Sequence, residues 1–269
     1  MDRDRPVPLH PIRAQRGGSG EPVVLLLHGL GATCDVWQGL CQVLAQHRAG
    51  SWIALDLPGH GGSARLPRYS IGTLAAATAP HVGEKEHVLV VGHSLGGAVG
   101  LALSSGWFGL RVSAALGIGI KVAWTDAELA AARERADRPV KWFPTREEAA
   151  RRHLRVAGLD GLVPPDEPWV DAGLVERDGQ WGLALDPAAS AVGAPNMPGL
   201  LAAARAAGAA SVLARGEDDH LVTPEQLHAL DPGAVDLPSL GHNAHVEDPR
   251  AIWELIENLA TAASPPPRS

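Results

Sequence analysis

The sequence predicts an α/β fold, in which a mostly parallel, twisted sheet has helices on both faces and an inserted helical cap. Short apolar runs rich in Val, Leu and Ile recur along the chain, and segments of helical period separate them. Strands that alternate with helices in this way are typical of a parallel sheet. From about residue 121 to residue 195 the alternation stops, which indicates an insertion into one core domain.

The chain of 269 residues is long enough for one large core with such an insertion. We predict the core in two parts, residues 1–120 and 196–263, with the helical cap over residues 121–195 between them. Residues 264–269 are rich in proline and are predicted to be a disordered tail.

In the first part of the core, apolar runs predict buried strands at residues 21–27, 52–55, 88–91 and 112–118. Between these strands, helices are predicted at about residues 34–46, 70–82 and 98–103. In the first of these helices the apolar side chains recur at i, i+3, i+4 and i+7, the spacing of one helix face. One or two edge strands are expected near residues 7–14.

The cap is predicted to hold helical pieces over residues 126–135 and 146–156 among proline-rich loops, without a buried strand. The alternation then resumes with a strand at 211–214, a helix after Pro224, a short strand near 234–237 and a final helix near 249–259.

Composition and charge exclude several classes of protein. The formal net charge of −7 does not favour a nucleic-acid binder. No run of about 18 apolar residues is present, so no membrane span is expected. The first residues are charged without a following apolar run, which predicts a cytoplasmic protein rather than a secreted one. Cys34 and Cys41 lie seven positions apart and predict free thiols in a reducing compartment. The oligomeric state is not indicated.

The stretch GHSLGG at residues 92–97 joins a predicted strand directly to a predicted helix. Such a sharp junction leaves Ser94 on a strained corner at the carboxyl edge of the sheet. Gly92 and Gly96 lack a Cβ, so strand and helix can approach each other closely. An oxyanion at this corner would lie near the amide of Leu95 and the positive end of the helix. We therefore predict that Ser94 is a nucleophile.

A serine needs a base to remove its proton, and two later stretches offer the groups for this. GEDDHLVTP at residues 216–224 follows a predicted strand and carries carboxylates to the same edge as Ser94. GHNAHVEDP at residues 241–249 follows the last strand and supplies histidines. The order Ser, Asp, His along the chain matches the nucleophile-elbow fold. Several acids and two bases remain open from the residues alone: Glu217, Asp218, Asp219, His242 and His245.

On these motifs the chain resembles the α/β-hydrolase superfamily, in its capped, esterase-like branch. The resemblance extends over nearly the whole chain through five stretches: His28–Gly29, DLPGHG at residues 56–61, and residues 92–97, 216–224 and 241–249. It implies the α/β-hydrolase fold and a triad of Ser94, Asp219 and His242.

Within the resemblance, Asp218 is the alternative acid, and Glu217 is disfavoured. His242 is preferred as base because an acidic residue, Glu247, follows it by five positions, and His245 is the competitor. The resemblance also implies an oxyanion hole made by the backbone amides of Leu30 and Leu95. In this scheme His242 accepts the Ser94 proton and Asp219 orients the imidazole.

The remaining histidines have structural interpretations. His93 is expected to turn away from the nucleophile into the core, His28 to brace the oxyanion loop, and His60 to belong to a turn. His242 and His245 have no metal-binding motif around them, so we expect neither a metal nor another cofactor. The arginine-rich part of the cap predicts a solvated helical face or, alternatively, a surface that attracts an anionic substrate.

The expected function is hydrolysis of a carboxylic ester, lactone or thioester of a small molecule, through an acyl-enzyme on Ser94. A serine nucleophile argues against carbon–halogen and epoxide hydrolysis, for which the superfamily uses an aspartate. Two alternatives remain. One is hydrolysis of a carbon–carbon bond in a β-diketone-type substrate by the same triad, and the other is a ligand-binding or tailoring homologue.

Overall fold

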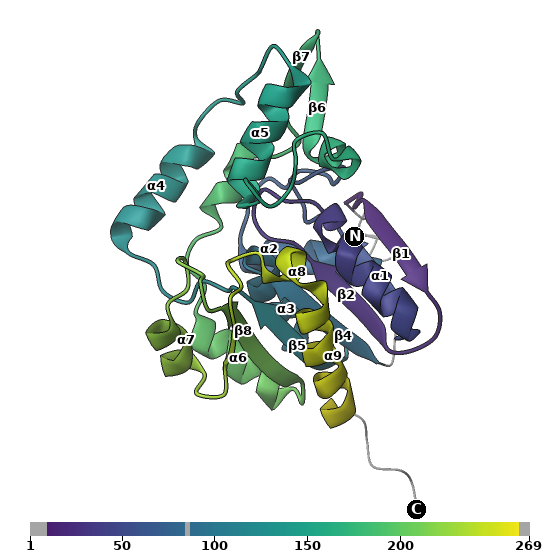
Figure 1. The fold of residues 1–269 in the computed structure, drawn as a ribbon. Coiled ribbons are helices and arrows are strands. Elements are labelled where there is room, and N and C mark those ends of the chain that lie inside the picture. The colour runs from purple at the N-terminus through teal and green to yellow at the C-terminus, as the bar shows by residue number, and fades with distance from the viewer. Residues whose placement is uncertain (1–9, 84–86, 264–269) are drawn as a thin grey trace, which may run out of the picture.

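The protein is described by a computed structural model that covers residues 10–83 and 87–263. The predicted tail at 264–269 lies outside the described residues, as do residues 7–9 of the predicted edge-strand region. Residues 10–13 of that region are not in a strand, and an edge strand begins only at Ala14. Figure 1 shows a central sheet between helices, with a further group of elements beyond one edge of the sheet.

The central sheet has seven strands in the order β1-β3-β2-β4-β5-β8-β9. The strands are β1 (Ala14–Gly18), β2 (Val23–Leu27), β3 (Ser51–Leu55), β4 (Val88–His93), β5 (Val112–Ile118), β8 (Ala210–Gly216) and β9 (Val235–Leu237). Only β1 is antiparallel to its neighbour, and all other pairs are parallel. The predicted mostly parallel sheet is therefore confirmed.

Helices cover both faces of this sheet, and β2 shows how the sequence achieves it. All five residues of β2 are buried, and successive side chains of a strand point to opposite faces. Leu25 packs in a cluster with α2 (Ile71–Thr78), α3 (Leu95–Ser104) and α6 (Met197–Ala206). Leu26 packs in a second cluster, which contains residues of three helices on the other face: α1 (Gln38–His47), α8 (Ala244–Glu247) and α9 (Pro249–Ala263).

Local boundaries differ from the prediction in one place on this second face. The helix expected over 34–46 is divided into a 3-10 turn, η1 (Cys34–Trp37), and α1. No side-chain cap marks the junction, which explains why the periodicity alone predicts one continuous helix here. A second 3-10 turn, η2 (Ala79–His81), extends α2, and α7 (Pro224–Leu230) follows β8.

The segment between β5 and α6 contains α4 (Asp126–Ala136), α5 (Arg146–Ala157), η3 (Pro168–Gly173), β6 (Leu174–Arg177), β7 (Gln180–Leu183) and η4 (Pro187–Ala191). These elements lie beyond the carboxyl ends of the parallel strands (Figure 1). The hairpin of β6 and β7 was not predicted, because most of its side chains are not buried. The Asp178-Gly179 pair between the two strands is a sequence that favours hairpin turns. Both residues have the positive φ that such a turn requires.

Candidate active site

Ser94 lies on the sharp junction between β4 and α3 that the sequence predicts. Its backbone has φ of 49° and ψ of −114°, which non-glycine residues rarely adopt, and its amide donates to the carbonyl of Ile118 at 2.8 Å. A Cβ on Gly92 would overlap the backbone of Gly96, and a Cβ on Gly96 would overlap the backbone of Leu27. The two glycines therefore permit the junction, and the junction presents Ser94 at the carboxyl edge of the sheet.

The acid and base candidates meet at the same edge. His242 Nδ1 donates to Asp219 Oδ2 at 2.8 Å, and the Asp219 side chain is completely buried. Its other oxygen accepts from the amide of Leu221 at 2.8 Å, so both carboxylate oxygens have a donor. The two alternative acids, Glu217 and Asp218, are exposed, and neither is hydrogen-bonded to a histidine among the described residues.

Arg215 shapes the loop that carries Asp219, and sequence analysis did not single it out. This buried guanidinium donates to the carbonyls of Val222 at 2.7 Å and Glu217 at 2.8 Å, and to the carboxylate of Asp236 at 2.8 Å. One side chain thus fixes both ends of the turn after β8. No local sequence pattern predicts this role of Arg215, because the carbonyls that its side chain binds belong to an irregular loop.

The backbone of His242 is hydrogen-bonded to the residue that precedes Ser94. His93, the residue before Ser94, donates from Nε2 to the carbonyl of His242 at 2.9 Å, and the two rings lie 4.7 Å apart. The ring of His242 also lies against Gly119, next to the Ile118 carbonyl that binds the Ser94 amide. No hydrogen bond joins Ser94 Oγ to His242 Nε2. Such bonds often tighten only when substrate is bound.

His245, the competing base, has a different environment. It is buried between the rings of Trp37 and His93, with centroid distances of 4.4 Å to each. Neither of its ring nitrogens has a hydrogen-bond partner in the described structure. Burial lowers its pKa to about 3, so the ring is neutral near physiological pH. His245 therefore lacks the carboxylate that would orient it and stabilise its charged form.

The other predicted histidines are buried, as expected for structural residues. His28 accepts from the amide of Leu57 at 2.9 Å through Nε2 and donates from Nδ1 to the carbonyl of Gly29 at 2.7 Å. It thereby ties the loop after β2 to the loop after β3. His60 packs edge-on against His28 at 5.0 Å, and burial lowers its pKa to about 3.

A cavity of about 380 Å³ opens beside Ser94, and its wall includes both predicted oxyanion residues, Leu30 and Leu95. The amide of Leu95 is the first of α3, and neither it nor the amide of Leu30 donates to another described residue. Free amides at a helix N-terminus are suited to bind a negative oxygen. The remaining wall comes mostly from apolar residues of the core and of the segment between β5 and α6.

A sequence model of the alpha/beta hydrolase family matches residues 24–255, which is most of the chain. The chain belongs to this family. Solved structures agree on the fold. The chain superposes on E-2-(acetamidomethylene)succinate hydrolase with a TM-score of 0.75 and 23% identity, over 93% of this chain and 95% of that one. A thioesterase domain from the curacin biosynthetic pathway gives 0.73 and 24%, over 91% and 95%. An esterase of M. tuberculosis gives 0.69 and 23%, over 95% and 93%.

Curated relatives match shorter parts of this family member. It is 40% identical over 96 residues to the dihydrolipoyllysine-residue acetyltransferase component of the acetoin cleaving system of Cupriavidus necator, which is 35% of this chain and 25% of that protein. It is 30% identical over 132 residues to 2-succinyl-6-hydroxy-2,4-cyclohexadiene-1-carboxylate synthase of Escherichia coli O1:K1, which is 47% of this chain and 49% of that protein. The chain thus spans from a quarter to about half of the relatives described here.

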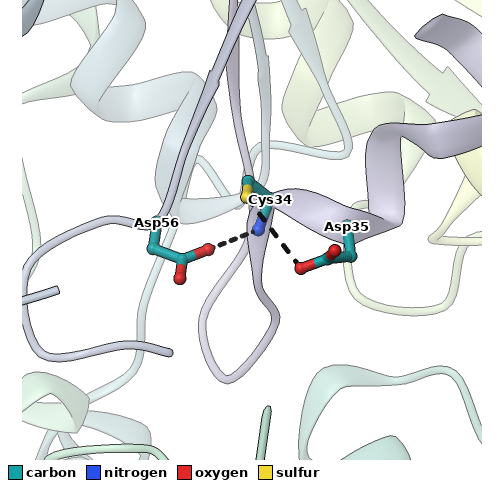
Figure 2. A group of neighbouring side chains, drawn as sticks. All are labelled: Cys34, Asp35 and Asp56. Carbon is teal, nitrogen blue, oxygen red and sulfur yellow. Dashed lines mark hydrogen bonds between the residues drawn. The ribbon is translucent and has the colours of Figure 1, made fainter. Parts of the chain in front are cut away.

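A second polar cluster lies on the other side of β2, where Cys34, Asp35 and Asp56 converge (Figure 2). Their potential ligand atoms lie within 4.8 Å of one another, an arrangement that could hold a metal ion. Arg13 occupies this position instead. Its guanidinium donates to Asp35 at 2.6 Å, to Asp56 at 3.2 Å and to the Cys34 sulfur at 3.1 Å.

The guanidinium of Arg13 neutralises one of the two carboxylate charges in this second cluster. The hydrogen bond to Asp35 raises the pKa of Arg13, and burial raises the pKa of the Cys34 thiol, which stays protonated. A neutral thiol beside a permanent cation is a poor metal ligand. We therefore assign the cluster a structural role at the start of the DLPGHG loop.

Within the described residues, none of the helices could cross a bilayer.

Proposed function

We propose that this family member is a serine hydrolase that cleaves a carboxylic ester, thioester or lactone of a small molecule through an acyl-enzyme on Ser94. The observation that carries the proposal is the hydrogen bond from His242 to the buried Asp219. The loop of His242 is also hydrogen-bonded to His93, which precedes the strained corner at Ser94. A cavity of about 380 Å³ lies within the size range of small-molecule sites.

The proposed reaction gives each of these groups one role. His242 Nε2 removes the Ser94 proton as Oγ attacks the carbonyl, while Asp219 holds the proton on Nδ1 and stabilises the imidazolium. The amides of Leu30 and Leu95 stabilise the oxyanion, each by about 3 kcal/mol. The imidazolium then protonates the leaving group. Water, activated by the same ring, releases the acid from Ser94.

The segment at 121–195 acts in this proposal as a cap. It contributes Lys121, Trp124 and Ser190 to the wall of the cavity, whereas the core contributes Ser94. Ester, thioester and lactone share the carbonyl that the core recognises. The cap therefore selects among them by the shape and charge of the rest of the substrate.

A second function with the same three residues is non-hydrolytic chemistry or cleavage of a carbon–carbon bond. The similarity to an acetyltransferase component and to a synthase favours keeping it as a candidate. Carbon–carbon hydrolysis also forms an acid with water, but from a β-diketone and not from an ester, and non-hydrolytic chemistry forms no acid. Turnover of simple esters therefore separates these possibilities from the proposal.

The test is turnover of p-nitrophenyl acetate and butyrate. The proposal predicts a burst of p-nitrophenol equal to the enzyme concentration, followed by steady release of acid. Ser94→Ala abolishes both phases, whereas Ser113→Ala, a serine of β5 that is not part of the cavity wall, retains them. A folded wild-type protein that turns over neither ester contradicts the proposal and favours the second function.

A further inference from the structure

One face of α4 forms a wall of the cavity beside Ser94. The residues of α4 in this wall are Glu128, Leu129, Ala131, Ala132 and Arg135. Their spacing is that of a single helix face, and no residue of α4 is fully buried. The helix thus covers the cavity on one side and is exposed to solvent on the other.

Of the two charged residues on this face, Glu128 has a partner of opposite charge and Arg135 has no ion pair among the described residues. Glu128 accepts from Lys121 Nζ at 2.5 Å, and its other oxygen accepts from the amide of Thr125 at 2.8 Å. The hydrogen bond from Lys121 lowers the pKa of Glu128 to about 2, so this pair is ionised and balanced. Arg135 forms no ion pair or side-chain hydrogen bond with any described residue. All five of its N–H donors are therefore available.

Glu128 and Arg135 are seven positions apart, which corresponds to about 10 Å along a helix. Between them the wall is apolar, with Leu129 on α4 facing a cavity that also contains Leu95 and Val192. The cavity therefore offers a hydroxyl, an apolar wall and one cation that has no ion pair or side-chain hydrogen bond to a described residue. The chain as a whole carries a net charge of −7, so a cation placed here attracts an anion against the overall field.

We propose that the substrate carries an anionic group that Arg135 binds, separated by an apolar segment from the carbonyl that Ser94 attacks. The proposal rests on the proposed function of Ser94 and specifies the class of its substrate. A planar guanidinium with two parallel N–H donors matches a carboxylate or a phosphate, and the charge strengthens both hydrogen bonds. The anion belongs either to the acyl half or to the leaving half of the substrate.

The first experiment compares p-nitrophenyl butyrate with the mono-p-nitrophenyl ester of succinic acid, which has the same chain length and a terminal carboxylate. Arg135→Gln is expected to lower kcat/KM for the succinate ester about tenfold, through KM, and to leave the butyrate ester within about twofold. Arg133→Gln is the matched control, because Arg133 is exposed on the same helix but is not part of the cavity wall.

The second experiment places the anion on the leaving half, by comparing 4-butanoyloxybenzoate with phenyl butyrate. If Arg135→Gln lowers kcat/KM for 4-butanoyloxybenzoate and not for phenyl butyrate, the proposal is supported and the anion belongs to the leaving half. If it lowers kcat/KM for the succinate ester and not for p-nitrophenyl butyrate, the anion belongs to the acyl half. In either case Arg135→Lys restores part of the loss, and added salt raises KM for the anionic ester alone.

Equal effects of Arg135→Gln on neutral and anionic esters, or effects on neither, overturn the proposal while Ser94 remains the nucleophile. Failure of the proposed function has a different signature, because wild-type protein then fails to hydrolyse even the neutral esters, or Ser94→Ala keeps hydrolysing them. Circular dichroism and thermal unfolding of each variant show that these comparisons are made between folded proteins.

Discussion

Two buried carboxylates follow parallel strands of the same sheet, and their partners differ. Asp56 follows β3 and faces the guanidinium of Arg13, whereas Asp219 closes the turn after β8 and faces the imidazole of His242. A guanidinium keeps its charge at any pH at which the protein is folded, but an imidazole gains and loses a proton near neutral pH. The same type of side chain at the same edge therefore has a permanent cation as its partner in one loop and an ionisable ring in the other.

The largest expected effect concerns the second carboxylate. Asp219→Asn should lower kcat for p-nitrophenyl butyrate by about 10⁴-fold, because an amide neither holds His242 in the required tautomer nor stabilises its cation. Steady-state kinetics measure this loss. Asp218→Asn is the matched control on the same loop, since Asp218 is exposed, and it should leave kcat almost unchanged. A comparable loss in Asp218→Asn would reverse the assignment of the acid.

Asp56→Asn should affect stability instead of chemistry. Asp56 accepts from the amides of Cys34 and Gly62 as well as from Arg13. Loss of its charge weakens these bonds, and we expect about 3 kcal/mol lower free energy of unfolding. Urea unfolding measures this change. Where the variant is folded, kcat should be close to wild type, and a loss of kcat without a loss of stability would remove the contrast between the two carboxylates.

His93 precedes Ser94 and is hydrogen-bonded to the loop of His242, and its replacement tests whether it positions the proposed base. His93→Ala removes the donor to the His242 carbonyl and the ring between His242 and His245. A displaced base should lower the burst rate by about 10- to 100-fold while KM changes little. Stopped-flow measurement of the burst gives both quantities. If only thermal stability falls and the burst rate is unchanged, His93 has no positioning role.

The smallest effect is a difference in pH dependence. Burial acts to raise the pKa of Asp56, but the neighbouring His28 ring, two backbone amides and the charge of Arg13 outweigh it and hold the pKa below its ordinary value. A carboxylate with a lowered pKa stabilises the fold above its unfolded pKa of about 4, and this contribution is lost as the pH falls through the folded value. Wild type should therefore lose more stability than Asp56→Asn on acidification, as urea midpoints from pH 6 to pH 3 would show.

Much of the fold and of the candidate site follows from local sequence patterns. The strand over residues 112–118 has the predicted bounds, because its run is apolar apart from Ser113 and glycine-containing segments flank it. The motif around Ser94 predicts the strained junction because glycine is the residue that the close approach requires. The turns after β8 and β9 bring Asp219 and His242 together; the residues alone left this pair open among several, and the family resemblance implied it.

Interactions between distant, unpatterned positions could not be predicted. Arg13 binds Asp35 and Asp56, which lie 22 and 43 positions along the chain, and nothing around an isolated arginine indicates such partners. Arg135 stood out only as part of an arginine-rich run, because its place in the cavity wall depends on how α4 lies over the core. The division at residues 121–195 remains a prediction about domains.

The proposed hydrolysis requires proton transfer from Ser94 to His242, and fluorophosphonate labelling tests this most directly, because the probe reacts with an activated serine. Peptide mapping should find the probe on Ser94 in wild-type protein. The labelling rate should fall at least about 10³-fold in His242→Ala and stay near wild type in folded His245→Ala. Labelling at another residue, or loss of labelling in His245→Ala alone, would contradict the account.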